Sequence, residues 1–239
     1  MSESPKIGQT PSGWSADVAG ISALAEPARR ALYLYVVEQP DPVSREQAAS
    51  ACDLPLHSAK FHLDRLVDEG LLDVTYRRLT GRTGPGAGRT AKLYRRSDRE
   101  LRVSLPERRY DLAGDILAAA IDRSTAEGVS VRDAVAEVAA LRGRALAEAA
   151  EPTGGTDLER SSKVLGENGY EPRPADGDLC LANCPFDRLA REHTELVCGM
   201  NVALVGGVLD GLRCESLEAV LEPAPGLCCV KARHRPPRS

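Results

Sequence analysis

The chain has 239 residues and a formal net charge of −4; 42% of its residues are hydrophobic and 28% are charged. These values fit an ordinary soluble globular protein with room for two modest domains. The N-terminal residues show no signal-peptide pattern and no stretch reads as a membrane span. We therefore expect a cytoplasmic protein with reduced thiols and no membrane partner.

The charge is distributed unevenly along the chain. Between Asp73 and Arg102, nine basic residues stand against three acidic ones. A local excess of positive charge on an acidic protein is typical of a surface that binds nucleic acid. The net charge alone therefore does not exclude DNA as a partner.

Residues 1–19 are polar and are predicted to form a disordered tail, followed by a first domain over residues 20–104. Within this domain, Pro27 predicts the start of a helix over residues 28–38. Ser44 and Gln47 form a capping-box pattern that predicts a second, short helix.

A third helix is predicted over residues 56–69, with Gly70 at its C-terminal cap. Its apolar residues recur at helical spacing and form a stripe that should be buried: Ala59, Leu63, Leu66 and Val67. The opposite side carries polar and aromatic residues that we predict contact DNA: His57, Ser58, Lys60, Phe61, His62 and Arg65. An exposed Phe61 is otherwise hard to explain, and on DNA it could meet a thymine methyl.

Two strands are predicted over residues 71–78 and 90–96, joined by a glycine-rich loop. Basic residues of this hairpin are predicted to contact DNA as well: Arg78, Arg82, Arg89 and Lys92. Three helices followed by a basic hairpin predict a winged helix-turn-helix, in which the hairpin follows the phosphate backbone or enters the minor groove. The glycines do not follow a strand–GxGxxG–helix pattern, so a nucleotide-binding loop is not expected.

Residues 105–152 are predicted to be helical, with a joint at Pro106 and a helix restart at Ser130. The second helix carries an apolar stripe: Val131, Val135, Val138, Leu141 and Leu146. This stripe has two interpretations, ordinary packing within the protein or the seam of a homodimer. A helix-turn-helix protein usually dimerises to span two half-sites.

The region from residue 153 to residue 233 is predicted to be an α+β domain organised around cysteines, with a tail over residues 234–239. It holds six of the seven cysteines: Cys180, Cys184, Cys198, Cys214, Cys228 and Cys229. In a chain with reduced thiols, this clustering indicates metal or cluster ligation. Structural zinc sites usually show two close cysteine pairs, whereas these cysteines are widely spaced, which favours a bulkier iron–sulfur cluster.

Adjacent residues of a strand point to opposite faces, and a strand is predicted over residues 227–232. We therefore expect only one of Cys228 and Cys229 to be a ligand. Zinc and a reversible thiol switch remain open alternatives. A redox enzyme using this pair would leave the basic hairpin unexplained, and no catalytic constellation emerges, so we expect a protein that is not an enzyme.

The run LPLHSAKFHLDRLVDEGLLDVTYRRLTGRTGPGAGRTAKLYRRS resembles the head of ArsR-related winged-helix repressors, in particular the SufR-type regulators of iron–sulfur cluster assembly. The runs NCPFDRLAREHTELVCGMNVALVGGVLDGL and LEPAPGLCCVKAR are similar to the cluster domain of that family. The resemblance implies a DNA-binding regulator of iron–sulfur assembly genes. It implies a homodimer on double-stranded operator DNA and a 2Fe–2S or 4Fe–4S cluster.

The resemblance also implies a ligand set. The family positions match Cys184, Cys198 and the Cys228/Cys229 pair, and Cys214 matches a further cysteine of some members at a shifted spacing. Cys180 does not match the family pattern, so it competes with Cys214 for the fourth position through its closeness to Cys184. Whether the loaded protein represses or activates is not implied.

Overall fold

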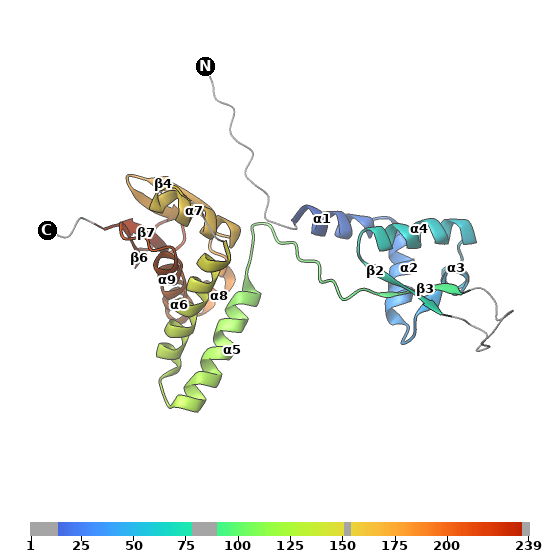
Figure 1. Ribbon diagram of the computed structural model, residues 1–239, viewed down its shortest axis with the longest axis horizontal. Helices are drawn as coiled ribbons and strands as arrows, with labels where there is room; N and C mark the ends of the chain where they lie inside the picture. The colour runs from blue at the N-terminus through green and yellow to red at the C-terminus, as the bar shows by residue number, and fades with distance from the viewer. Residues whose placement is uncertain (1–13, 78–89, 151–153, 236–239) are drawn as a thin grey trace, which may run out of the picture. The chain divides into compact units, whose positions relative to one another are not determined.

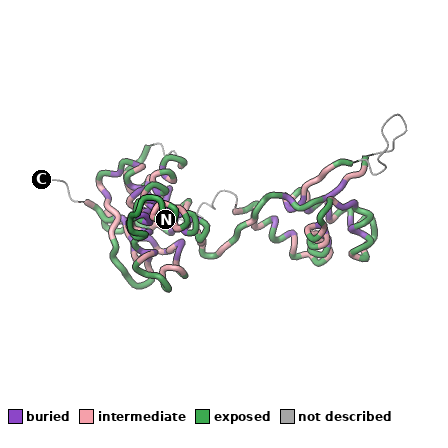
Figure 2. Tube along the Cα trace, turned by 90° about the horizontal axis from the view of Figure 1, so that it is seen from below, coloured by how far each residue is buried: buried purple, intermediate pink, exposed green. Residues whose placement is uncertain are grey.

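The computed structural model describes residues 14–77, 90–150 and 154–235, in two compact units, Met1–Val103 and Ser104–Ser239. Together they form an α+β protein with helix-turn-helix elements first, helices in the middle and a cysteine-bearing antiparallel sheet at the end. Figure 2 shows that each unit has its own buried interior.

Unit 1 contains four helices and three short strands within its described residues (Figure 1). In chain order they are α1 (Trp14–Ala23), α2 (Pro27–Glu38), β1 (Val43–Ser44), α3 (Arg45–Ala51), α4 (Leu56–Asp68), β2 (Leu72–Arg77) and β3 (Ala91–Arg96). The strands form an antiparallel sheet in the order β1-β3-β2. The predicted three helices and the two strands of the hairpin are confirmed as α2, α3, α4, β2 and β3.

Local signals explain these boundaries. The capping box at the start of α3 is complete, because the Gln47 N–H donates to Ser44 Oγ (3.1 Å) and the Ser44 N–H donates to Gln47 Oε1 (2.8 Å). Gly70 has a φ of 71°, which glycine adopts without strain and which ends α4 as expected.

The predicted N-terminal tail is wrong over its last residues, because α1 begins at Trp14; residues 1–13 lie outside the described part. What holds α1 is contact with residues distant in the sequence. Gly20 lies so close to Leu101 that an added Cβ would come within 2.7 Å of its Cδ1 atom. Asp17 also accepts a hydrogen bond from the Arg99 guanidinium at 2.9 Å.

Unit 2 contains five helices and four strands within its described residues. They are α5 (Tyr110–Glu127), α6 (Val131–Ala150), α7 (Asp157–Glu167), β4 (Pro172–Ala175), β5 (Asp178–Leu181), α8 (Asp187–Glu192), α9 (Thr194–Gly211), β6 (Leu217–Leu221) and β7 (Val230–His234). The four strands form one antiparallel sheet in the order β4-β5-β7-β6. The predicted tail overlaps this sheet at His234, the last residue of β7, and residues 236–239 lie outside the described part.

The centre of unit 2 is the contact between α6 and α9. Gly143 and Gly207 lie at the crossing, where an added Cβ would come within 2.1 Å of the Leu204 and Ala140 carbonyl oxygens, respectively. The two backbones can approach this closely only because neither glycine carries a side chain. The predicted middle segment is therefore part of the core of the cysteine-bearing unit, not a separate layer.

The apolar stripe of α6 has two parts, one packed within unit 2 and one exposed where a homodimer seam could form. Val135 and Val138 are 2% and 8% exposed and belong to the core of unit 2. Val131 and Leu141 are 47% and 50% exposed. The first pair therefore supports packing within the unit, and only the second pair remains available to a partner.

Among the described residues, α9 alone is long and apolar enough to cross a membrane by length and composition. Nine of its residues are buried within unit 2, including Cys198 and Asn201. This is the pattern of a core helix, whose surroundings rather than lipid cover its apolar side chains.

Candidate DNA-binding face and cysteine site

The outer face of α4 is the most accessible part of the helix-turn-helix. Phe61 is 66% exposed, and His57, Lys60 and Arg65 are exposed as well. No side chain caps the N-terminus of α4, which follows Pro55, so its first N–H groups and the positive end of the helix dipole remain available to a phosphate.

Other predicted contact residues of α4 are less accessible. His62 shares the inward row with Ala59 and Leu66, three residues before it and four after it. Its Nδ1 atom lies 3.6 Å from Glu26 Oε2 at the start of α2, and its side chain is only 15% exposed. Ser58 is half-buried. The structure thus places His62 and Ser58 at the edge of the face, whereas Phe61 and Lys60 lie on it.

Lys92 is held within the unit. Its Nζ atom lies 2.5 Å from Asp64 Oδ1 and 5.0 Å from the centre of the Tyr94 ring. Burial raises the pKa of Asp64, but the hydrogen bond and charge of Lys92, together with the Tyr94 hydroxyl and the Lys60 charge, outweigh burial, so the pKa is lowered. Lys92 therefore neutralises an acidic residue of α4. The other predicted contacts of the hairpin, Arg78, Arg82 and Arg89, lie outside the described residues.

Four cysteines of unit 2 interact in two pairs. Cys184, which follows β5, neighbours Cys228, and Cys198 on α9 neighbours Cys229. The neighbouring Cys228 thiol and burial raise the pKa of Cys184, and the Cys184 thiol in turn lowers the pKa of Cys228. Burial together with Cys229 raises the pKa of Cys198 to about 11. A metal would therefore have to displace protons on binding.

The strand predicted over residues 227–232 begins too early, because β7 starts only at Val230, after Cys228 and Cys229. The Cys228 N–H donates to the Leu181 carbonyl (2.8 Å), and the Cys229 carbonyl accepts from the Glu222 N–H (2.7 Å). Strand alternation therefore does not decide which thiol is a ligand: Cys228 neighbours Cys184, and Cys229 neighbours Cys198.

The remaining thiols lie elsewhere. Cys214 contacts Ser161 Oγ at 3.4 Å and the Asp157 carbonyl at 3.9 Å. Cys180 alternates along β5 with the buried Leu179 and Leu181, so it points to the opposite face of the sheet. Cys52 is half-buried at the C-terminal cap of α3 in unit 1.

A buried polar chain ends on one of the four cysteines. The Asn201 side-chain N–H donates to Cys228 Sγ (3.3 Å), and Tyr170 O–H donates to the Asn201 oxygen. Both residues are buried, at 1% and 3% exposure. Because the hydroxyl occupies the amide oxygen, the amide N–H is directed at sulfur, which is the arrangement that stabilises a thiolate.

The donor set is chemically suited to a thiophilic group. Thiolates are the ligands of iron–sulfur clusters and of zinc. Within the described parts of the chain, no three His, Cys, Asp or Glu side chains converge closely enough to hold one metal ion. By donor type alone, the four thiols suit either of these groups.

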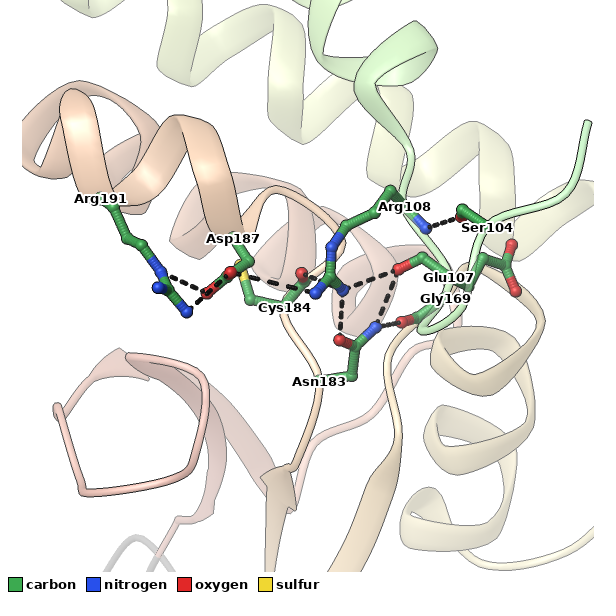
Figure 3. Close-up of polar contacts among 8 residues, drawn as sticks. All are labelled: Ser104, Glu107, Arg108, Gly169, Asn183, Cys184, Asp187 and Arg191. Atoms are coloured by element: carbon green, nitrogen blue, oxygen red, sulfur yellow. Dashed lines mark hydrogen bonds and ion pairs between the residues drawn. The ribbon is translucent and has the colours of Figure 1, made fainter.

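A second polar network fastens Cys184 to the start of unit 2 (Figure 3). The Arg108 guanidinium donates to Asn183 Oδ1 (2.5 Å) and to the Cys184 carbonyl (3.3 Å). The Asn183 amide donates in turn to the carbonyls of Glu107 (3.0 Å) and Gly169 (2.5 Å). Sequence reasoning missed Arg108 and Asn183, because no local pattern shows that residues 75 positions apart will meet.

The comparisons with known proteins concern unit 1. Residues 24–75 match a family model described as a helix-turn-helix domain. No curated protein and no solved structure matches the chain. The match spans α2 to β2, so the chain carries a helix-turn-helix DNA-binding domain, as a transcriptional regulator does.

Proposed function

We propose that this protein is a transcriptional regulator of the repressor type whose binding to operator DNA is controlled by an iron–sulfur cluster. The observation that carries the proposal is the gathering of Cys184, Cys198, Cys228 and Cys229 into two neighbouring pairs of thiols. These four residues would hold the cluster, and either a two-iron or a four-iron cluster accepts four thiolates. When bound, the cluster would supply a group that changes with oxygen, iron and electron supply.

The chain's own residues shape this site. Met200, Phe186 and Val230 are at most 1% exposed and pack around the cysteines' segments, which limits the access of water. Asn201 donates to sulfur, and Arg108 fixes the loop that carries Cys184. These contacts hold thiolates in place and offset part of the cost of burying their charge.

The DNA side of the proposal rests on α4. We assign base contacts to Phe61 and Lys60 and a phosphate to the uncapped start of the helix. Arg78, Arg82 and Arg89 would add phosphate contacts that do not depend on sequence. Double-stranded operator DNA is then the partner, and the cytoplasm is the compartment in which reduced thiols and DNA coexist.

The resemblance of residues 54–97 and 183–233 to SufR-type regulators supports iron–sulfur assembly genes as the target. A protein that holds a labile cluster can report the cluster supply to those genes. The regulatory function needs no reaction on a substrate, so the proposal does not make the protein an enzyme.

The two thiol pairs favour a second candidate, a thiol switch without a cluster. In this case each pair would form a disulfide, and two electrons and two protons would pass to an oxidant such as a peroxide. A zinc-responsive regulator is the corresponding candidate with a resident ion.

Anaerobic purification of the full-length protein tests these candidates. The cluster predicts a brown protein that contains iron and acid-labile sulfide and that loses both in air. A colourless protein with zinc, or with neither metal, would overturn the cluster and leave the corresponding alternative.

A further inference from the structure

The chain between the two units is fastened at both ends. On the side of unit 1, Asp17 accepts hydrogen bonds from the Arg99 guanidinium (2.9 Å) and from the Arg102 N–H (3.3 Å), and Leu101 packs on the core. On the side of unit 2, the first bond to the rest of the unit is at the Glu107 carbonyl, which accepts from Asn183 (3.0 Å). Only residues 103–106 lie between these points.

The fastening in unit 2 is made on the cysteine loop itself. The Arg108 guanidinium contacts Asn183 Oδ1, the Cys184 carbonyl and, at 3.9 Å, Asp187 Oδ2. The next residue adds a backbone bond, from the Arg109 N–H to the Pro185 carbonyl (3.1 Å). Figure 3 shows the Arg108 side chain directed at this loop. The segment that leads to the DNA-binding unit is therefore bound to a proposed ligand and its two neighbours.

We propose that Arg108 is a positioning residue that couples the state of the cysteine site to DNA binding, by clamping residues 104–109 onto the loop 183–185. This inference rests on the proposed function, since it gives the route by which the cluster would act on the helix-turn-helix. Cys184 is fixed when it is a ligand, and its carbonyl then stays in place as an acceptor for Arg108. Without the bond from Cys184 to the cluster, the loop is held to residues 107–109 by hydrogen bonds alone, which are weaker than a ligand bond.

The clamp changes the length of free chain. With the clamp closed, residues 103–106 bond only within the segment, where Ser104 Oγ accepts from the Arg108 N–H, and they span at most ~14 Å when extended. If the Glu107, Arg108 and Arg109 contacts with the rest of unit 2 all open, residues 103–109 are free and span at most ~25 Å. In a dimer, the second DNA-binding unit meets its half-site at an effective concentration that falls as its tether lengthens beyond the required span. The clamped, loaded protein therefore binds an operator more tightly than the released one.

The coupling is reciprocal. If cluster binding favours the clamp and the clamp favours DNA, then operator DNA must strengthen the hold on the cluster by the same factor. The guanidinium is suited to this role because its planar fork reaches Asn183 and Cys184 at once. A lysine would retain the charge but offer a single point donor.

The test uses full-length protein loaded anaerobically with iron and sulfide, and double-stranded DNA selected by that loaded protein from a random-sequence library. Affinity is measured for the loaded and the cluster-free forms of each variant. We expect Arg108→Ala to hold iron and sulfide like the wild type but to bind the DNA equally in both forms, at the cluster-free affinity. Arg108→Lys should lie between. Arg191→Ala, which removes an exposed arginine that pairs with Asp187 at 3.0 Å, is the matched control and should behave like the wild type.

Two further measurements keep the inference testable if Arg108→Ala does not load. Inserting four glycines between Val103 and Ser104 lengthens the tether with every contact intact and should lower the loaded affinity. Hydrogen exchange over residues 103–109 should be slow in the loaded wild type and fast in the cluster-free form. An Arg108→Ala protein with a full cluster and an unchanged affinity ratio, or an insertion without effect, overturns the clamp alone. A wild type that loads a cluster but binds DNA equally in both forms overturns the proposed function, and the clamp with it.

Discussion

The hydrogen bond from Asn201 to Cys228 gives the cysteine site a residue that can tune it. A hydrogen bond to a ligating sulfur stabilises the reduced, more negative cluster and so raises its reduction potential. A bond of about 0.5–1.5 kcal/mol corresponds to about 20–65 mV for a one-electron couple.

We therefore expect Asn201→Leu to lower the midpoint potential by an amount in this range, measured by an anaerobic redox titration followed by absorbance. Tyr170→Phe removes only the hydroxyl that orients the amide and should lower the potential less. If neither variant shifts the potential while both keep the cluster, Asn201 does not contact a cluster ligand.

Serine variants of the cysteines should fall into two groups that differ in iron and sulfide content. Serine at Cys184, Cys198, Cys228 or Cys229 should each leave less than half of the wild-type iron and sulfide, because the loss of one thiolate opens a coordination position to solvent and oxygen. Cys214→Ser and Cys180→Ser should keep the full content, because these thiols lie with Ser161 and on the far face of β5. Full cluster content in Cys184→Ser or Cys198→Ser would refute the ligand set.

At the scale of elements, α4 carries the DNA prediction. Lys60→Ala and Phe61→Ala should reduce the discrimination between operator and random DNA, by about 1–3 kcal/mol for a base contact. Arg82→Ala should weaken both kinds of DNA about equally and flatten the salt dependence. His62→Ala should act mainly on stability, since its ring lies against Glu26. Competition assays at several salt concentrations distinguish these outcomes. Equal loss on both DNAs for Phe61→Ala would place α4 outside the groove.

The crossing of α6 and α9 makes unit 2 sensitive to one methyl group. In Gly207→Ala the new Cβ would meet the Ala140 carbonyl, so the helices must separate, at a cost of about 1–3 kcal/mol or more. Gly199→Ala lies on the same helix with no atom within 4 Å and should be neutral or stabilising.

Urea unfolding of cluster-free protein, followed by circular dichroism, measures this difference. Trp14 is the sole tryptophan of the chain and lies in unit 1, so its fluorescence transition should stay in place in both variants. Equal stability of Gly207→Ala and Gly199→Ala would show that the two helices are not this close.

These elements show what could be predicted from the sequence. Ser44 with Gln47, Gly70, and the Ala59–Leu63–Leu66 spacing are local signals, and they place α3 and α4 correctly. The helix α1 was missed because Leu101 and Arg99 hold it from a distance. The strand predicted over residues 227–232 begins too early, because no local sequence feature near Cys228 marks where strand pairing begins. Which thiols meet depends on the packing of α9 against the sheet, which no spacing rule contains.

For the assembly of the protein, we predict that a second copy binds at the groove of about 610 Å³ between α5 and α6, which Leu141 and Ala119 help to line. Figure 1 shows these helices side by side. Ile121 and Leu141 are 55% and 50% exposed on them, and Arg123 and Glu137 form an ion pair nearby (2.7 Å). Apolar residues rimmed by both charges suit a two-fold interface.

Leu141→Asp should therefore yield folded monomers in sedimentation experiments. Val135→Asp should instead unfold unit 2, because Val135 is buried. Tyr76→Asp, at a 65% exposed site in unit 1, is a control that should leave the assembly unchanged. A dimer that survives Leu141→Asp would move the interface away from this groove.

The order of the two cores along the chain has a consequence during synthesis. Unit 1 is complete at residue 103, and domains fold as they leave the ribosome, so the helix-turn-helix can fold while residues 104–239 are still being made, a matter of about 7–27 s at 5–20 residues/s. All four cysteines of the site are translated within the last quarter of the chain. Under the proposed function, each newly synthesised copy lacks a cluster and competes with other apoproteins for one. Its loading with a cluster would then report how readily clusters reach other newly made apoproteins.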